Sequence, residues 1–259
     1  MPGSLKSTSE GGTLILTLSN PEARNTLNPE IYAAGIEALN AAENNPDIRS
    51  VVITGEGSVF CAGGNLQRLQ ANRKEAPEVQ AQSIDGLHSW IDSIRTYPKP
   101  VLAAVEGAAA GAGFSLALAC DFVVAASNAV FVMSYVNVGL SPDGGGTWAL
   151  ARALPRALAN ELLMLGERVA AQRLCDLGLV NRVCAPGDAL TASLQLAAQL
   201  NARAPNALAS IKELVNDAAT HSLSEQLDNE RNHFVRNLHH TNGAEGIDAF
   251  LQKRSPRYR

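Results

Sequence analysis

Hydrophobic and polar positions in the first part of the chain follow strand and helix periods in turn. Thr13–Leu18 alternates apolar and polar residues like a half-buried strand, and a turn at 20–22 stops it. Asn28 and Pro29 then supply an N-cap and a first helical residue, which predicts a helix to about Glu43. Ser50–Thr54 is a continuous apolar run of strand length. We therefore expect a strand, a helix and a buried strand in that order.

The middle of the chain continues this alternation. Residues 71–82 are polar and charged, which predicts an exposed loop, and an amphipathic helix follows until Pro98. The segment 107–120 is so rich in Gly and Ala that it must pack closely or approach a ligand with bare backbone. Further buried strands are expected at 100–105, 122–126 and 130–134.

The apolar period becomes helical almost throughout after residue 147. Strands and helices alternate before that point, which is typical of an α/β protein. We expect two regions, an α/β core over 1–195 and a helical C-terminal region over 196–259.

Composition and charge exclude several classes of protein. With 259 residues, 46% of them hydrophobic and only 18% charged, the chain has the composition of a packed globular protein. Its 21 Lys and Arg against 25 Asp and Glu form no basic cluster, so nucleic acid is not an expected partner. The uncharged stretch 122–142 is interrupted by Asn128 and Asn137, so a membrane span is not expected either.

The N-terminal segment and the cysteines bear on location and metal binding. The first residues lack the apolar core of a signal peptide and the Arg-rich pattern of a transit peptide, so we expect a cytoplasmic protein. Four cysteines form no C-x-x-C pair, and no His/Cys spacing matches a zinc site. No metal is therefore expected.

The strongest candidate for catalysis is Asp143, which three glycines follow. A carboxylate before a helix is ordinarily a cap or a turn residue, but three consecutive glycines exceed what a cap needs. Two glycine-rich turns, at 60–65 and 107–113, each follow a buried strand. They are either tight turns for close packing or a pair of free backbone N–H groups that hold an oxyanion, and the pattern alone leaves both open.

Other motifs give weaker signals. No phosphate-binding glycine motif is complete, and the segment 113–117 lacks the last glycine of a nucleophile elbow. His88 stands on an amphipathic helix, where a surface or packing role is the ordinary interpretation.

Four motifs occur in an order that is more specific than any one of them. The motifs are NPEARN at 20–25, FCAGGNL at 60–66, KPVLAAVEG at 99–107 and GLSPDGGGT at 139–147. With them the chain resembles the enoyl-CoA hydratase/isomerase (crotonase) family over essentially its whole length, and the segment FLQKRSP at 250–256 resembles the end of that family.

This resemblance implies an α/β crotonase fold, a spiral of β-β-α units with an all-helical C-terminal region that mediates trimers. A homotrimer or a dimer of trimers is then expected. The implied substrate is an acyl-CoA, whose coenzyme A enters as part of the thioester, so no separate cofactor is expected.

The resemblance also implies which residues form the site. The backbone N–H groups of Gly64 and Ala112 would hold the thioester oxygen and stabilise an enolate. Asp143 would act as the acid/base. Residues implied to contact the substrate or its CoA are Ala23, Arg24, Ala62, Gly64, Asn65, Leu66, Ala112, Tyr135 and Lys253.

The chain departs from the family's hydratases at two positions. Those enzymes use two glutamates, which fall here on Ser115 and Tyr135, and neither hydroxyl replaces a carboxylate base at neutral pH. One base suffices to move a double bond, so the expected reaction is enoyl-CoA isomerisation with Asp143. The alternatives are an enoyl-CoA hydratase, an aryl-CoA hydrolase or dehalogenase with Asp143 as nucleophile, and a non-catalytic member. The dehalogenase reaction is associated with an activating histidine, for which His88 is not in evident register.

Overall fold

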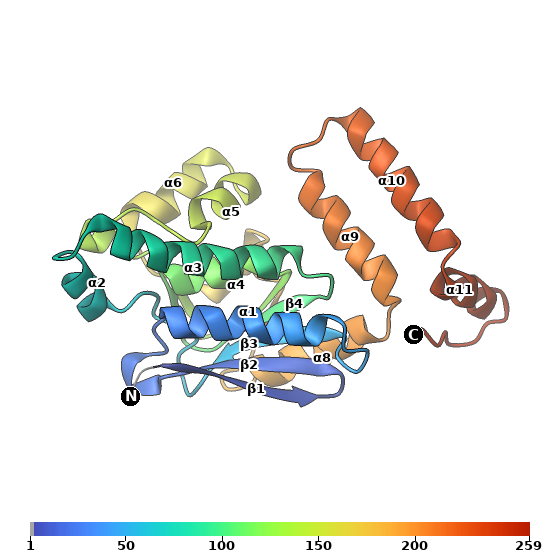
Figure 1. The fold of residues 1–259 in the computed structure, drawn as a ribbon, viewed down its shortest axis with the longest axis horizontal. Helices are drawn as coiled ribbons and strands as arrows, with labels where there is room; N and C mark the ends of the chain where they lie inside the picture. Colours follow the sequence, from blue (N-terminus) through green and yellow to red (C-terminus); the bar gives the residue numbers. More distant parts are fainter. Residues whose placement is uncertain (1–2) are drawn as a thin grey trace.

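Residues 3–259 are described in a computed structural model, which forms two sheets surrounded by helices (Figure 1). The strands are β1 (Ser4–Glu10), β2 (Thr13–Ser19), β3 (Ser50–Gly55), β4 (Val101–Val105), β5 (Ala108–Ala110), β6 (Phe122–Ala126), β7 (Val130–Val132), β8 (Val169–Ala170) and β9 (Arg182–Cys184). The helices are α1 (Pro29–Glu43), α2 (Leu66–Asn72), α3 (Pro77–Thr96), α4 (Ala112–Ala119), α5 (Gly146–Ala153), α6 (Arg156–Leu165), α7 (Ala171–Asp176), α8 (Ala189–Asn201), α9 (Pro205–Asp217), α10 (Leu223–Leu238) and α11 (Thr241–Leu251), with short 3-10 helices η1 (Pro21–Ala23) and η2 (Val136–Val138).

The larger sheet has the strand order β1-β2-β3-β4-β6-β9. Only β1 and β2 pair antiparallel, whereas β2 through β9 run parallel along this order. The smaller sheet has the order β5-β7-β8. Because β5 follows β4 after a turn of only two residues, the chain passes from the large sheet to the small one directly before α4. The expected α/β architecture with a helical C-terminal region is confirmed.

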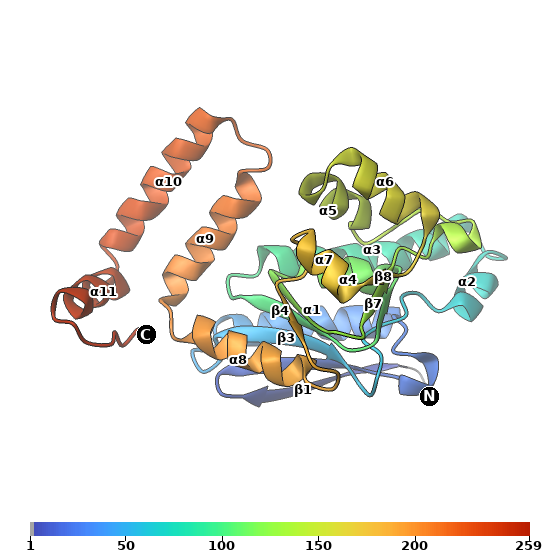
Figure 2. The same cartoon turned by 180° about the vertical axis from the view of Figure 1, so that it is seen from behind.

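Helices cover both faces of the larger sheet. The helices α1 and α3 pack together over one face, and α8 lies on the other (Figures 1 and 2). Burial follows this arrangement, since Val51 and Ile53 of β3 belong to the main core, whereas Val52 packs with Leu196 and Ala197 of α8. The boundary expected at 195/196 lies within α8 and stays a prediction.

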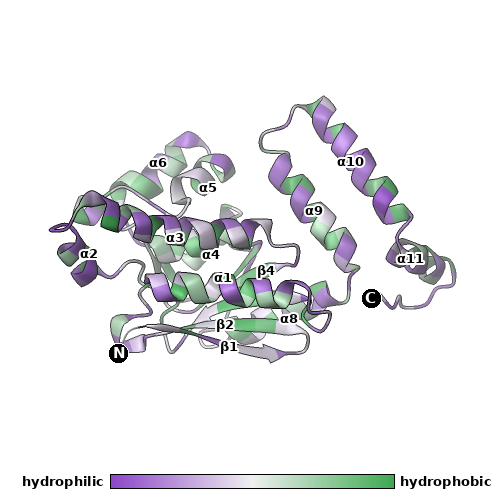
Figure 3. Cartoon of the chain, viewed as in Figure 1, coloured by the Kyte–Doolittle hydropathy of each residue, from purple (hydrophilic) through white to green (hydrophobic). Residues whose placement is uncertain are grey.

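The last three helices form an arm that extends away from the sheets. In Figure 1 the helices α9, α10 and α11 lie to one side of the body, and Figure 3 shows hydrophobic and hydrophilic residues interspersed along α9 and α10. Several large apolar side chains of this arm face solvent within the single chain. None of the helices between residues 3 and 259 is both long and apolar enough to span a membrane.

Local predictions from the sequence succeeded in part. The helix after Asn28 ends at Glu43 as expected, and the Asn28 side chain accepts a hydrogen bond from the Ile31 N–H. The loop expected at 71–82 was wrong, because α2 runs to Asn72 and α3 already begins at Pro77. The first turns of α3 are polar because they face solvent, and this polarity hid the helix. The strands β1, β5, β8 and β9 were not predicted.

Candidate active site

The two glycine-rich turns lie side by side because a short β-pairing holds them there. The Cys61 N–H donates to the carbonyl of Ala108 at 3.0 Å, and the Ala110 N–H donates to the carbonyl of Cys61 at 2.9 Å. Gly63 has a φ of +85°, and a Cβ added to it would lie 2.6 Å from the Ala110 oxygen and 3.1 Å from the Ala112 nitrogen. Only glycine therefore allows the turns to approach this closely.

Each turn presents a backbone N–H group without an acceptor. Within residues 3–259, neither the Gly64 N–H nor the Ala112 N–H donates a hydrogen bond. Ala112 is the first residue of α4, and the first N–H groups of a helix have no partner inside it. The positive end of the helix dipole adds to the attraction for a partial negative charge. The pair is chemically suited to hold a carbonyl oxygen that gains negative charge.

The three glycines after Asp143 are explained by the packing of this loop. Gly144 and Gly145 have φ values of +60° and +78°, which side chains with a Cβ rarely adopt. A Cβ on Gly146 would lie 2.7 Å from the Ser115 Oγ. The glycines therefore let the loop press against α4, and this contact places Asp143 beside the start of that helix.

Two hydroxyl groups form hydrogen bonds to Asp143. They belong to Tyr135 and Ser115, the positions at which the resemblance implies the glutamates of hydratases. The Tyr135 hydroxyl donates to Oδ1 of Asp143 at 2.6 Å, and the Ser115 Oγ donates to the Asp143 carbonyl at 2.9 Å. Burial, together with the negative charge of Asp143, raises the pKa of Tyr135. The phenol thus stays protonated at neutral pH and donates its hydrogen bond to the carboxylate.

These groups meet in one cavity of about 670 Å³. Asp143 is the only Asp or Glu that lines it among the described residues. Of the predicted site residues, the cavity brings together Ala62, Gly64, Leu66, Ala112, Tyr135 and Asp143.

Cys61 lies beneath this site, and complete burial raises the pKa of its thiol to about 12. At neutral pH this thiol is therefore not a nucleophile.

Four predicted residues do not line the cavity. Asn65 is the N-cap of α2, and its side chain accepts hydrogen bonds from two backbone N–H groups of that helix. Ala23 belongs to η1, and Arg24 follows it with an exposed side chain and a carbonyl that accepts from the Ala62 N–H at 3.0 Å. Lys253 follows α11, which lies at the opposite end of the molecule from α2 (Figure 1).

Several polar residues of the cavity were not predicted from the sequence, among them Tyr32, Arg68 and His88. His88 was interpreted as a surface or packing residue, but it lines the cavity and its Nε2 accepts the Gly144 N–H at 3.4 Å. The sequence did contain a signal for this location. His88 directly follows the buried Leu87 of α3 and stands four positions after Ile84, so it shares a helix face with Ile84, which also lines the cavity. Tyr32 comes from α1 and Arg68 from α2. No local sequence pattern predicted that these two helices contribute to the same cavity.

Comparisons with known proteins show which proteins this chain is similar to. The profile of a family described as enoyl-CoA hydratase/isomerase matches residues 8–259. The chain is 37% identical to a 1,2-epoxyphenylacetyl-CoA isomerase of Escherichia coli (strain K12), over 96% of this chain and 95% of that protein. It is 36% identical to a carnitinyl-CoA dehydratase of Salmonella enteritidis PT4 (strain P125109), over 99% and 98%. A crystal structure of an enoyl-CoA hydratase from Polaromonas sp. JS666 is 81% identical, with a TM-score of 0.99 over 99% of this chain and 100% of that one.

Proposed function

Because the chain belongs to the enoyl-CoA hydratase/isomerase (crotonase) family and is an acyl-CoA enzyme by that membership, we propose that it moves a double bond within an enoyl-CoA. Asp143 is the single acid/base, and the N–H groups of Gly64 and Ala112 form the oxyanion hole. Coenzyme A takes part only as the thioester portion of the substrate.

The reaction needs one proton to leave and one to return. With a 3-enoyl-CoA, the Asp143 carboxylate removes a proton from the α-carbon, and the electron pair moves onto the thioester oxygen between Gly64 and Ala112. The resulting dienolate takes the proton back at the γ-carbon from the Asp143 carboxyl group. The double bond thereby becomes conjugated with the thioester, and the carboxylate is regenerated.

The observation that carries this proposal is that Asp143 is the one carboxylate lining the cavity within residues 3–259. Hydration by two carboxylates has no second carboxylate to use, since Ser115 and Tyr135 occupy the glutamate positions and both bond to Asp143. Isomerisation by one base needs no further group.

The experiment is to give purified protein a 3-enoyl-CoA and, separately, a 2-enoyl-CoA, and to follow the ultraviolet absorbance of the conjugated thioester. The proposal expects absorbance to rise with the 3-enoyl-CoA as the conjugated isomer forms. The 2-enoyl-CoA should show no loss of absorbance from hydration. Loss of absorbance with the 2-enoyl-CoA and no rise with the 3-enoyl-CoA would replace isomerisation by hydration.

One observation favours a second candidate reaction. His88 lines the same cavity as Asp143, so a histidine is available to a mechanism in which Asp143 attacks an aryl-CoA as nucleophile. The Nε2 of His88 already accepts the Gly144 N–H, however, and an imidazole that accepts there carries its proton on Nδ1, so this bond must break before His88 can act as a base. Release of halide from a halogenated aroyl-CoA by the wild-type protein would support this candidate over isomerisation.

Two further parts of the proposal concern CoA binding and assembly. We propose that Ala23, Arg24 and Lys253 contact the CoA portion, Lys253 from a neighbouring subunit. The arm then mediates a homotrimer or a dimer of trimers. Support comes from large apolar side chains of the arm that are at least half exposed in the single chain, Ile211, Val215, Leu223, Leu227, Phe234, Phe250 and Leu251.

A further inference from the structure

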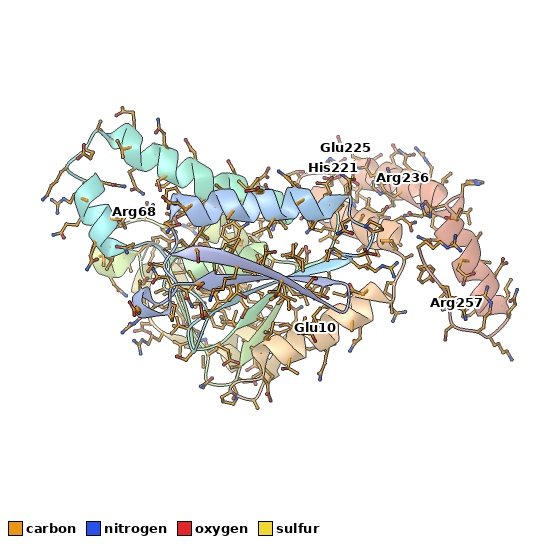
Figure 4. The ribbon with its side chains drawn as sticks, turned by 60° about the horizontal axis from the view of Figure 1, so that its bottom comes forward. Glu10, Arg68, His221, Glu225, Arg236 and Arg257 are labelled. Carbon is orange, nitrogen blue, oxygen red and sulfur yellow. The ribbon has the colours of Figure 1, made fainter. Side chains whose placement is uncertain are left out.

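The cavity contains a positive charge that the proposed reaction does not use. Arg68 comes from α2 (Figure 4). It lines the cavity together with Tyr32 of α1 and Gln80 of α3. No carboxylate of residues 3–259 forms an ion pair with Arg68. Its Nε–H is shielded from solvent and has no acceptor among these residues. The guanidinium therefore has unused donors at the edge of a ligand-sized cavity.

An arginine in this position is costly unless something accepts its hydrogen bonds. Buried polar groups in proteins are almost always hydrogen-bonded, and a guanidinium offers five N–H donors in a planar fork that matches a carboxylate. Other half-buried cations find acceptors within the protein. Lys212 lies 2.8 Å from the carboxylate of Asp121, and Lys99, which has no acidic partner among the described residues, donates to three backbone carbonyls. Residues 3–259 supply neither kind of acceptor to the Nε–H of Arg68. The missing acceptor is thus expected from the ligand.

The Tyr32 hydroxyl is a second donor at the same place. Burial raises the pKa of Tyr32 to about 12, and the charge of Arg68 and its hydrogen bond to the phenol oppose this shift only in part. The phenol is therefore protonated at neutral pH. Tyr32, Arg68 and Asp143 all line the same cavity. A substrate that reacts at Asp143 is consequently within reach of Arg68 if its acyl group extends toward α1.

On these contacts we propose that Arg68, together with the Tyr32 hydroxyl, binds a carboxylate on the acyl group. The preferred substrates are then enoyl-CoA thioesters of dicarboxylic acids. This inference rests on the proposed function for the reaction but concerns the acyl group that the site selects. A carboxylate there also balances the positive charge of Arg68, the only Lys or Arg of residues 3–259 that lines the cavity.

The test measures binding, so that it does not depend on turnover. Saturated CoA thioesters of dicarboxylic acids with five to eight carbons are compared by calorimetry with the monocarboxylic acyl-CoA of the same length. The wild type should bind at least one dicarboxylic thioester about tenfold or more tightly than its partner, as charge-assisted hydrogen bonds predict. Arg68→Gln should remove this preference, and Arg68→Lys should retain only part of it.

Arg73 provides the matched control. It follows α2 directly, its side chain is exposed, and it does not line the cavity, so Arg73→Gln makes the same change of charge nearby. This variant should keep the preference. Circular dichroism and thermal unfolding of each variant check that the fold is intact.

Three results would overturn the inference. The wild type could show no preference at any length, or the preference could survive Arg68→Gln. The variant could also weaken both series equally, which would assign Arg68 to the CoA portion instead. Because saturated thioesters do not react, a preference that depends on Arg68 stands even if no double bond is moved. Such a result would leave carboxylate binding established and the proposed isomerisation wrong.

Discussion

At the scale of single residues, the central contact is the hydrogen bond from Tyr135 to Asp143. From the sequence, Tyr135 was expected to contact the substrate, and its hydroxyl was expected to be a poor replacement for a glutamate base. At 2.6 Å from Oδ1, the phenol instead fixes the orientation of the one carboxylate in the cavity within residues 3–259. Ser115 fixes the backbone of the same residue. In the proposed reaction, Tyr135 and Ser115 thus orient the base Asp143 and do not themselves transfer protons.

Tyr135→Phe should therefore lower kcat for isomerisation about tenfold to a hundredfold. The variant removes a hydrogen bond to a charged group, which is worth about 1.5–3 kcal/mol. Steady-state kinetics with a 3-enoyl-CoA measure the effect.

Tyr97→Phe is the control, since it removes a buried hydroxyl that donates to the Leu39 carbonyl outside the site. It should lower the free energy of unfolding but leave kcat unchanged. Equal kcat values for wild type and Tyr135→Phe would mean that this bond does not orient the base.

At the scale of elements, the proposed oxyanion hole depends on where α4 begins. Ala112 is the first residue of this helix and lines the cavity, and its N–H donates no hydrogen bond within residues 3–259. Proline is tolerated at the first helical position, so Ala112→Pro removes the N–H with little cost to the helix. The expected loss in kcat is about 10²- to 10³-fold, typical for one oxyanion donor.

Ala112→Gly keeps the N–H and serves as the comparison for this variant. It should retain most of the activity, while both variants keep a native circular dichroism spectrum. If Ala112→Pro is folded and as active as Ala112→Gly, the second oxyanion donor is not at this position.

Some of these elements could be predicted from the sequence, and others could not. The helix after Asn28 and the strand β3 were predicted because their signals are local, an N-cap with proline and an apolar run. The strand β1 was missed because its residues are almost all exposed and show no apolar period. Gly64, Ala112 and Asp143 came from ordered motifs. Tyr32 and Arg68 could not be found, because they meet only through the packing of α1 and α2.

At the scale of the whole molecule, burial of weak acids sets the response of stability to alkaline pH. Burial raises the pKa of Tyr32, Tyr97 and Cys61 to about 12 each. The folded state therefore keeps protons that the unfolded chain loses from about pH 9 upward. Their contribution is complete below the unfolded pKa values, and stability falls as pH rises toward 12.

Cys61→Ala tests this dependence because it removes one fully buried acid. Between about pH 9.5 and 11.5, a thiol that ionises only in the unfolded chain adds about 1 kcal/mol per pH unit to the fall in unfolding free energy. Urea unfolding across this range should show a shallower decline for Cys61→Ala than for the wild type. The lost side-chain volume lowers stability at every pH, so the slope is the relevant quantity. Equal slopes would show that the thiol is not protected from ionisation.

The proposed isomerisation depends on Asp143 as the only acid/base. The most direct measurement is the rate at which Asp143→Asn converts a 3-enoyl-CoA to its conjugated isomer, with binding of a saturated acyl-CoA measured on the same sample. We predict that the variant binds the acyl-CoA but loses at least about 10²-fold in rate, because the amide cannot accept the proton. A variant that binds and isomerises at the wild-type rate would contradict the account.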